Sequence, residues 1–406
     1  MPDPTTEAAR RLGSNQFLRA SVVRFGFWRR YLGLCLRSMK AGAAVSREGD
    51  VSLAARDAAT RALDAAGLDE ATCVIVAATP EHLDEGLELC AALRDVVGAG
   101  AQIVGGATSC AMVPGDAATE EGPALGVLVL EQRAHVFSFR ADEPDELRAA
   151  AQRAGAGALG IVFADPAAPL QRLLGALGRE APKARVAGGG VAVEGGLLLD
   201  DDIVSAHAVG AFFPAPSRVA VAQSHLPIGA PLLVTRSEGR SLIELDSRPA
   251  VEALAALAGQ PGLSGDALQF VALALNPHPG EPFRPDDFIA VQLLGVDEEH
   301  GSLETGIPVP EGHSVSFTLR DGMGARRTLQ HALDRLGAAP PAFGVYFDCA
   351  SRGTTLYGVD GLDLNLIEKS LGAFPLLSLR TSFELGPAGD ALGVHLFTGV
   401  LALGDR

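Results

Sequence analysis

Several features are missing from this sequence of 406 residues, and each absence excludes a class of protein. The five cysteines include no C-x-x-C pair, which disfavours a disulfide framework or a structural zinc site and fits a reducing cytoplasm. No apolar run is long enough to cross a membrane as a helix, so no integral membrane segment is predicted. No P-loop and no G-x-G-x-x-G loop leading into a helix occur, and the nine histidines form no H-x-x-x-H or H-E-x-x-H pair. A nucleotide site is thus weakly supported, and a metal site built from neighbouring ligands is not predicted.

Positive charge is also in short supply. Lysine and arginine number 33 against 49 aspartates and glutamates, for a net charge of −16. Binding nucleic acid or an anionic membrane needs a basic face, so neither partner is expected. The chain is 48% hydrophobic, which is enough apolar material for large cores, and its length suits two or three domains. The abundance of alanine, glycine and arginine is typical of a GC-rich bacterium, and we expect a cytoplasmic protein.

Residues 1–38 differ from the rest in carrying many arginines and almost no carboxylates. One interpretation is a basic amphipathic helix lying on a membrane. The other is an extension outside the fold, either disordered or the product of a misassigned start. Met39 begins a stretch, MKAGAAVS, that reads as the first strand.

A strand–helix–strand pattern occurs three times along the chain. In each unit an apolar run ends at a turn, a helical pattern follows, and a second strand closes the unit. The first and second strands of the three units are 73–79 and 102–109, 157–166 and 184–192, and 343–349 and 374–387. The strands of a unit are roughly thirty residues apart, the length of a crossover connection. The pattern predicts an α/β fold.

Segments between these units alternate between apolar and polar residues, as half-buried antiparallel strands do. We therefore expect two domains with mixed β-sheets flanked by helices. The sequence GQPGLSGD, residues 259–266, breaks the pattern and marks a boundary between them. NPHPGEPFRPDD, residues 276–287, is predicted to be a loop because it holds four prolines.

The turn DCASRG after the strand at 343–349 carries reactive residue types. Cys349 is either a thiol nucleophile, with His395 or His225 as base, or a packed apolar group, which is the commoner state of a free cysteine. Arg352 is better explained as a clamp for a carboxylate, because a guanidinium matches that anion bidentately. Glu384, in the turn SFELGP, is a candidate to receive an amine or to pair with Arg352.

Two further patterns leave alternatives open. Gly188 and Gly189 end a predicted strand, where glycine lets the backbone approach a ligand closely or simply makes a tight turn. A single histidine needs no sequence partner to hold a haem, so an axial haem ligand is compatible with the spacing. The candidates are His82, His207, His225 and His395.

Five stretches in this order and spacing resemble the FIST family, named for F-box and intracellular signal transduction proteins. They are AQSHLPIGAPLLVTRSEGRSLIELDSRPA at 222–250, ARVAGGGVA, DCASRG, SFELGP and GVHLFTGVLAL. The last keeps His395 and Thr398 of the family's closing strand. Ser351 and Phe383 stand where the family usually has glycine, which adds side chains to its pocket. The resemblance covers residues 39–406 and implies an N-terminal FIST domain at 39–258 and a C-terminal FIST domain at 259–406.

The resemblance implies a sensory protein that binds a small ligand, such as an amino acid, and passes the signal to a signalling protein in trans. It also leaves haem, with nitric-oxide sensing, as an alternative cofactor and function. No catalytic residue and no metal are predicted, although a hydrolase or transferase using Cys349 is the enzyme alternative. The predicted ligand-binding residues are Cys349, Ser351, Arg352, Gly353, Glu384, Gly386 and His395, followed by Gly188, Gly189, His225 and Arg236. Arg352 would take a carboxylate and Glu384 an amine where the two turns meet at one sheet edge.

Overall fold

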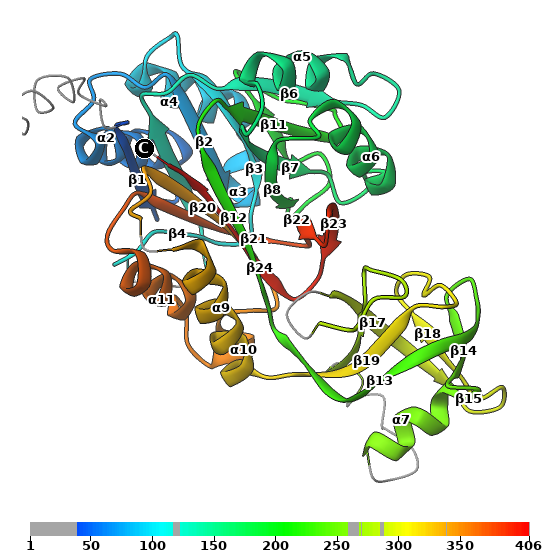
Figure 1. Ribbon diagram of the computed structural model, residues 1–406. Coiled ribbons are helices and arrows are strands. Elements are labelled where there is room, and N and C mark those ends of the chain that lie inside the picture. The colour runs from blue at the N-terminus through cyan, green and yellow to red at the C-terminus, as the bar shows by residue number, and fades with distance from the viewer. Residues whose placement is uncertain are drawn as a thin grey trace, which may run out of the picture. The chain divides into compact units, whose positions relative to one another are not determined.

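The computed structural model describes residues 39–116, 122–258, 268, 270–284, 288–337 and 339–405. The predictions for residues 1–38 and for the break at 259–266 lie outside these ranges. Residues 39–406 form one compact unit. It contains four β-sheets with helices packed on them (Figure 1). The predicted α/β class with mixed sheets and flanking helices is confirmed.

The first sheet is built from the N-terminal half of the chain. Its strands, in spatial order, are β1 (Ala41–Ser46), β5 (Leu125–Leu130), β2 (Cys73–Ala78), β3 (Gln102–Ala107), β9 (Leu197–Leu199) and β10 (Asp202–Ile203). The associated helices are α2 (Val51–Ala66), α3 (Pro80–Leu83) and α4 (Gly86–Val97). Asp50 begins α2 by accepting a hydrogen bond from the Leu53 amide, and Gly67 ends it in the left-handed conformation at φ 60°.

The second sheet combines residues that are far apart in sequence. Its order is β23 (Ala391–His395), β22 (Glu384–Ala388), β8 (Arg185–Gly190), β7 (Leu159–Ala164), β11 (Ala208–Phe213) and β6 (His135–Phe139). Helices α5 (Asp145–Ala154) and α6 (Leu170–Glu180) cover one face, where their apolar side chains form a core with Val162 and Phe212. The hairpin β22–β23, from the C-terminal end of the chain, thus extends a sheet built from residues 135–213.

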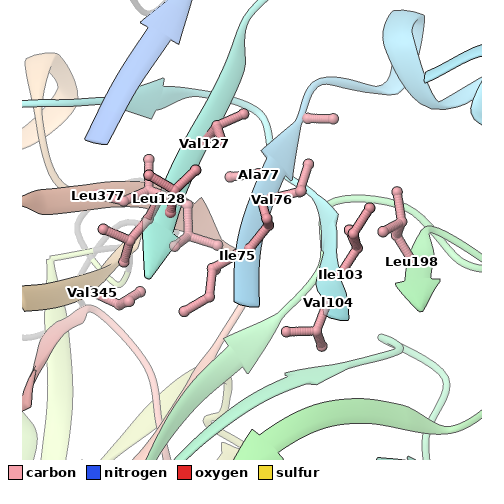
Figure 2. Packing of buried hydrophobic residues seen from close by; sticks show 14 of the residues in the cluster. Ile75, Val76, Ala77, Ile103, Val104, Val127, Leu128, Leu198, Val345 and Leu377 are labelled. Carbon is pink, nitrogen blue, oxygen red and sulfur yellow. The ribbon is translucent and has the colours of Figure 1, made fainter. Parts of the chain in front are cut away.

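The third sheet contains the strand that leads into the predicted turn at Cys349. Its order is β12 (Ser217–Gln223), β24 (Thr398–Gly404), β20 (Phe343–Cys349), β21 (Leu376–Thr381) and β4 (Ala111–Met112). Helices α9 (Gly322–Leu336) and α11 (Leu362–Leu371) pack on one face, while the short helix α10 (Thr354–Tyr357) follows the β20 turn. The opposite face joins a core shared with the other two sheets, in which Val345 and Leu377 lie near Ile75 and Val127 (Figure 2).

The fourth sheet closes on itself. Its order is β13 (His225–Glu238), β19 (Ser314–Arg320), β16 (Val271–Leu275), β17 (Ile289–Asp297), β18 (Ser302–Thr305), β14 (Ser241–Leu245) and β15 (Arg248–Pro249). An additional pairing of β14 with β13 completes the ring, and α7 (Ala250–Ala258) packs beside it. The ring has a separate apolar core. The predicted domain boundary at 258/259 falls between α7 and β16 and stays a prediction.

The three predicted strand–helix–strand units are all present. Their strands form parallel pairs, β2 with β3, β7 with β8, and β20 with β21. Each strand of these pairs is almost wholly buried, as expected for a parallel pair covered on both faces. Among the described residues, no helix is both long and apolar enough to cross a membrane.

Candidate functional site

The turns that carry the predicted ligand residues are neighbours. β20 and β21 run parallel, and their last residues, Cys349 and Thr381, lie opposite each other. The Ala350 amide donates to the Thr381 carbonyl at 3.0 Å. Beyond β21 the chain turns into β22, where Glu384 lies between Gly189 of β8 and His395 of β23 in the strand register. Four residues predicted from separate motifs therefore lie in one region: Cys349, Glu384, Gly189 and His395.

Arg352 is completely buried in this region and is held by the protein itself. Its guanidinium is 2.8 Å from the Asp363 carboxylate and 3.3 Å from that of Asp348. It also donates to the hydroxyls of Ser224 at 2.7 Å and Tyr357 at 2.6 Å. Burial alone would lower the pKa of Arg352, but Asp363 and the other neighbours outweigh it and hold the pKa well above its ordinary value. Asp363 thus takes the carboxylate role that the sequence had assigned to a ligand.

A second buried arginine lies beside the first and was not predicted. Arg380 on β21 is 3% exposed and is 2.9 Å from the Asp348 carboxylate, so Asp348 lies between two guanidinium groups. Asp348 and Arg380 face each other in the register of the parallel pair. The sequence contained a signal for this pair: Asp348 and Arg380 are each the second-last residue of an otherwise uncharged strand, β20 and β21. An opposite pair at matching positions indicates a buried ion pair.

Glu384 is fully buried among hydroxyl groups. It accepts hydrogen bonds from Thr381 at 2.9 Å and from the hydroxyl of Thr398 at 2.7 Å. Burial raises the pKa of Glu384 to about 8, despite those hydrogen bonds. At neutral pH this side chain is therefore mainly uncharged, which is a poor state for receiving an ammonium group.

Cys349 has surroundings that suppress thiol chemistry. It is 4% exposed. Burial first, and the nearby Glu384 second, raise the pKa of Cys349 to about 12. A nucleophilic cysteine needs a lowered pKa and access to substrate. The environment of Cys349 is the opposite, and it resembles that of an ordinary packed cysteine.

The rest of the β20 turn is shaped by backbone contacts. Gly353 has φ 63° and ψ −136°, a conformation that favours glycine, and it begins α10. The carbonyl of Ser351 accepts a hydrogen bond from Arg320 of β19. The turn is thereby connected to the closed fourth sheet.

The candidate histidines lie in different elements. His225, at the start of β13, contacts the Thr318 hydroxyl through Nδ1 at 3.0 Å, and burial lowers the pKa of His225 to about 4. Nε2 of His395 is 3.0 Å from the Pro387 carbonyl. His82 is buried in α3, and the Nδ1 of His207 accepts from the Ala141 amide. Within the described ranges, no cluster of three or more His, Cys, Asp or Glu residues could hold a metal ion. Haem binding stays a prediction.

The predicted glycines serve packing in the structure. A Cβ on Gly189 would lie 2.4 Å from the Thr381 side chain, and one on Gly188 would lie 2.2 Å from the Val162 carbonyl oxygen. Gly386 similarly faces Val221 at 2.9 Å. The space that these glycines leave is filled by neighbouring strands.

Arg236 is not part of this region. It lies on β13 within the closed sheet, its side chain is 61% exposed, and it pairs with Glu244 at 3.3 Å. The binding roles of Arg236 and of the other predicted site residues stay predictions.

A groove of ≈ 770 Å³, which the sequence did not indicate, lies beside β12. Its walls come from β12, the C-terminal half of α9, the β22–β23 turn and the loop between β16 and β17. The ionisable lining residues are Arg185, Arg218, His278, Glu281, Arg284, Arg335 and Asp390. They come from separate parts of the chain, so no local motif announces them.

Two contacts hold the groove together. Arg218 donates to both oxygens of Asp405 at 3.0 Å and to the Leu336 carbonyl at 2.9 Å, which ties β12 to the end of α9. Gly389 in the β22–β23 turn has φ +60°, and a Cβ there would lie 2.4 Å from the His278 ring. The loop between β16 and β17 therefore packs directly against this turn.

Comparison with known proteins agrees with the motifs. The FIST N domain matches residues 72–248, and the FIST C domain matches residues 228–387. An uncharacterized protein of Mycobacterium tuberculosis is 29% identical over 387 residues, with 90% of this chain and 99% of the relative covered. An uncharacterized protein of Mycobacterium bovis is 28% identical over 396 residues, with 90% and 98% covered. The likeness extends over both FIST domains.

Proposed function

Because the chain belongs to the FIST family of sensory proteins in signal transduction, we propose that it senses a small carboxylate-bearing ligand bound in the groove beside β12. The volume of the groove, ≈ 770 Å³, is that of a typical small-molecule site. The site acts by binding and not by turnover. Cytoplasmic location and a signalling protein in trans are parts of the same proposal.

The observation that carries this proposal is the convergence of arginines. Arg185 of β8, Arg284 of the β16–β17 loop and Arg335 of α9 line one hollow, in which Arg218 of β12 is already paired with Asp405. They do so in a chain whose net charge is −16, so the local excess of positive charge stands out from the rest of the surface. Guanidinium groups bind carboxylates bidentately, which supports a ligand of that chemistry.

An amino acid is the finer form of the proposal. Glu281 and Asp390 also line the groove, and both are exposed. A carboxylate with an ammonium group would meet arginine and acid in the same hollow. Glu281 already pairs with Arg284 at 3.1 Å, so a zwitterionic ligand would exchange partners with an existing exposed pair.

Ligand binding would also supply a signal. The groove joins the loop between β16 and β17 to the third sheet and to α9. A bound ligand with contacts on both walls would stabilise the existing packing of this loop against the β22–β23 turn, and a partner protein would detect that stabilised arrangement. Such a signal requires the loop to have two arrangements and the ligand to bind one of them more tightly than the other.

Calorimetry with a panel of amino acids and dicarboxylates tests the proposal. Arg185→Ala and Arg284→Ala should each weaken binding by about tenfold or more, since a hydrogen bond to a charged group contributes about 1.5–3 kcal/mol. Arg172→Ala is the matched control, because Arg172 is an exposed arginine of α6 that does not line the groove. Unchanged affinity in both groove variants, or no heat with any member of the panel, would refute the proposal.

A further inference from the structure

The floor of the groove is the edge of a β-strand. β12 is the terminal strand of the third sheet and pairs on one side with β24. The groove is lined by four consecutive residues of this strand, Arg218 to Val221. The strand is long enough to present its backbone to a ligand, and α9 and the β22–β23 turn rise on either side of it.

The backbone groups that point into the groove follow from the pairing. The Asp405 amide donates to the Pro216 carbonyl at 2.9 Å, and the Ser224 amide donates to the Phe397 carbonyl at 3.1 Å. In an antiparallel pair, backbone groups alternate between the partner and the opposite side. The even-numbered residues from 216 to 224 therefore face β24. Val219 and Val221 direct their N–H and C=O groups to the outer edge.

Those outward groups are not used by the protein. Among the described residues, no strand, side chain or turn forms a hydrogen bond with the N–H or C=O of Val219 or Val221 on that edge. The next outward carbonyl, that of Gln223, accepts from Thr328 and limits the open edge at one end. Two residues with matching donors and acceptors are thus available inside a positively charged groove.

We propose that the ligand of this groove is a short acidic peptide that binds in extended form as an additional strand on β12. This deepens the proposed function and rests on it, since it identifies the ligand class at the same site. Main-chain hydrogen bonds from Val219 and Val221 fix the peptide backbone, and the exposed arginines Arg185 and Arg284 receive its carboxylates. The open edge suits a peptide of roughly three to five residues at the usual rise per strand residue.

A free amino acid uses less of this surface. It has no internal peptide group to exchange both hydrogen bonds with one residue of the edge strand. A peptide with acidic side chains at alternate positions places its carboxylates on one face of the added strand. Strand addition therefore predicts that the protein binds a peptide more tightly than a free amino acid. It also predicts that only every second peptide amide is needed for binding.

The first test uses a capped pentapeptide that alternates glutamate and valine, compared by calorimetry with free glutamate. The peptide should bind at least about tenfold more tightly than glutamate. N-methylation of its amides, one at a time, should reduce affinity at alternate positions only, because only those amides face β12. Methylation that has no effect at any position, or the same effect at every position, would overturn strand addition.

The second test changes the protein. Val219→Pro removes one outward N–H and leaves the hydrogen bonds to β24 in place, a position where an edge strand tolerates proline. It should reduce peptide affinity by about tenfold, whereas Val219→Ala should bind the peptide nearly as wild type does. Equal binding by both variants contradicts the proposal. If Val219→Pro does not fold, the N-methyl series still decides the question.

The two proposals fail in different ways. Arg185-dependent binding of free glutamate without a preference for the peptide leaves the proposed function intact and removes strand addition. Peptide binding that survives both Arg185→Ala and Arg284→Ala contradicts both the acidic-ligand site and the peptide's place in it. No binding of either probe contradicts both.

Discussion

The buried cluster around Arg352 and the groove around Arg185 contain the same residue types but differ in what those residues contact. Arg352 has no exposed surface, and its donors are engaged by Asp363, Asp348 and neighbouring hydroxyls. Arg185 and Arg284 of the groove are exposed instead. A guanidinium taken out of water must be paired by the protein, whereas one beside water keeps the capacity to bind a ligand. Burial therefore identifies Arg352 as a structural arginine, which the local motif could not do, and exposure makes Arg185 a candidate for the proposed site.

The largest expected effect follows from removing the buried arginine. Arg352→Ala leaves Asp363 buried with its main cationic partner gone, which should lower the free energy of unfolding by about 3–5 kcal/mol. Chemical denaturation of wild type, Arg352→Ala and a control variant, Arg185→Ala, measures the loss of stability. Arg185→Ala, at an exposed position, should change stability by no more than about 0.5 kcal/mol. Equal midpoints for the two variants would remove the contrast between cluster and groove.

The next effect is a dependence of stability on pH. The pKa of Glu384 is raised from 4.5 to about 8, so the folded protein holds a proton that the unfolded chain has released over this interval. Its contribution is fully present below pH 4.5 and is lost as pH rises toward 8. The loss is on the order of 1.4 kcal/mol per pKa unit at most.

Glu384→Gln isolates this contribution, because the amide keeps the shape and does not titrate. Unfolding free energies measured from pH 5 to 8 should decline more steeply in the wild type than in this variant. All other titrating groups are shared, so they cancel in the difference. Parallel curves would mean that Glu384 is ionised in the folded state.

The smallest effect is an expected lack of reaction at Cys349. Because burial raises the pKa of Cys349 to about 12, a thiol reagent at pH 7.5 should modify the folded wild type no faster than Cys349→Ala. Unfolding should then expose one additional thiol in the wild type. Rapid labelling of Cys349 in the folded protein would instead revive the enzyme alternative.

Part of the candidate site could be predicted because its signals are local. The DCASRG and SFELGP turns each follow a strand, and two parallel strands of one crossover unit must end at the same edge. That reasoning brings Cys349 near Thr381 and Glu384, as observed. It could not supply the partners of Arg352. In sequence, Ser224 precedes the closed fourth sheet, whereas Arg352 follows it. The packing of α11 brings the carboxylate of Asp363 to Arg352.

By itself, the sequence determined the three parallel strand–helix–strand units of this protein. These units are predicted from short stretches of sequence, because they depend only on the local spacing of apolar residues and on the glycines that end the elements. The unit β2, α4 and β3 is an example. Only the tertiary structure decided that β22 joins β8, that Asp363 neutralises Arg352, and that β12 lies at an edge with arginines above it. The alternation in RVAVAQ is the same for an edge strand and a central one, because the difference depends on which other segments occupy its two sides.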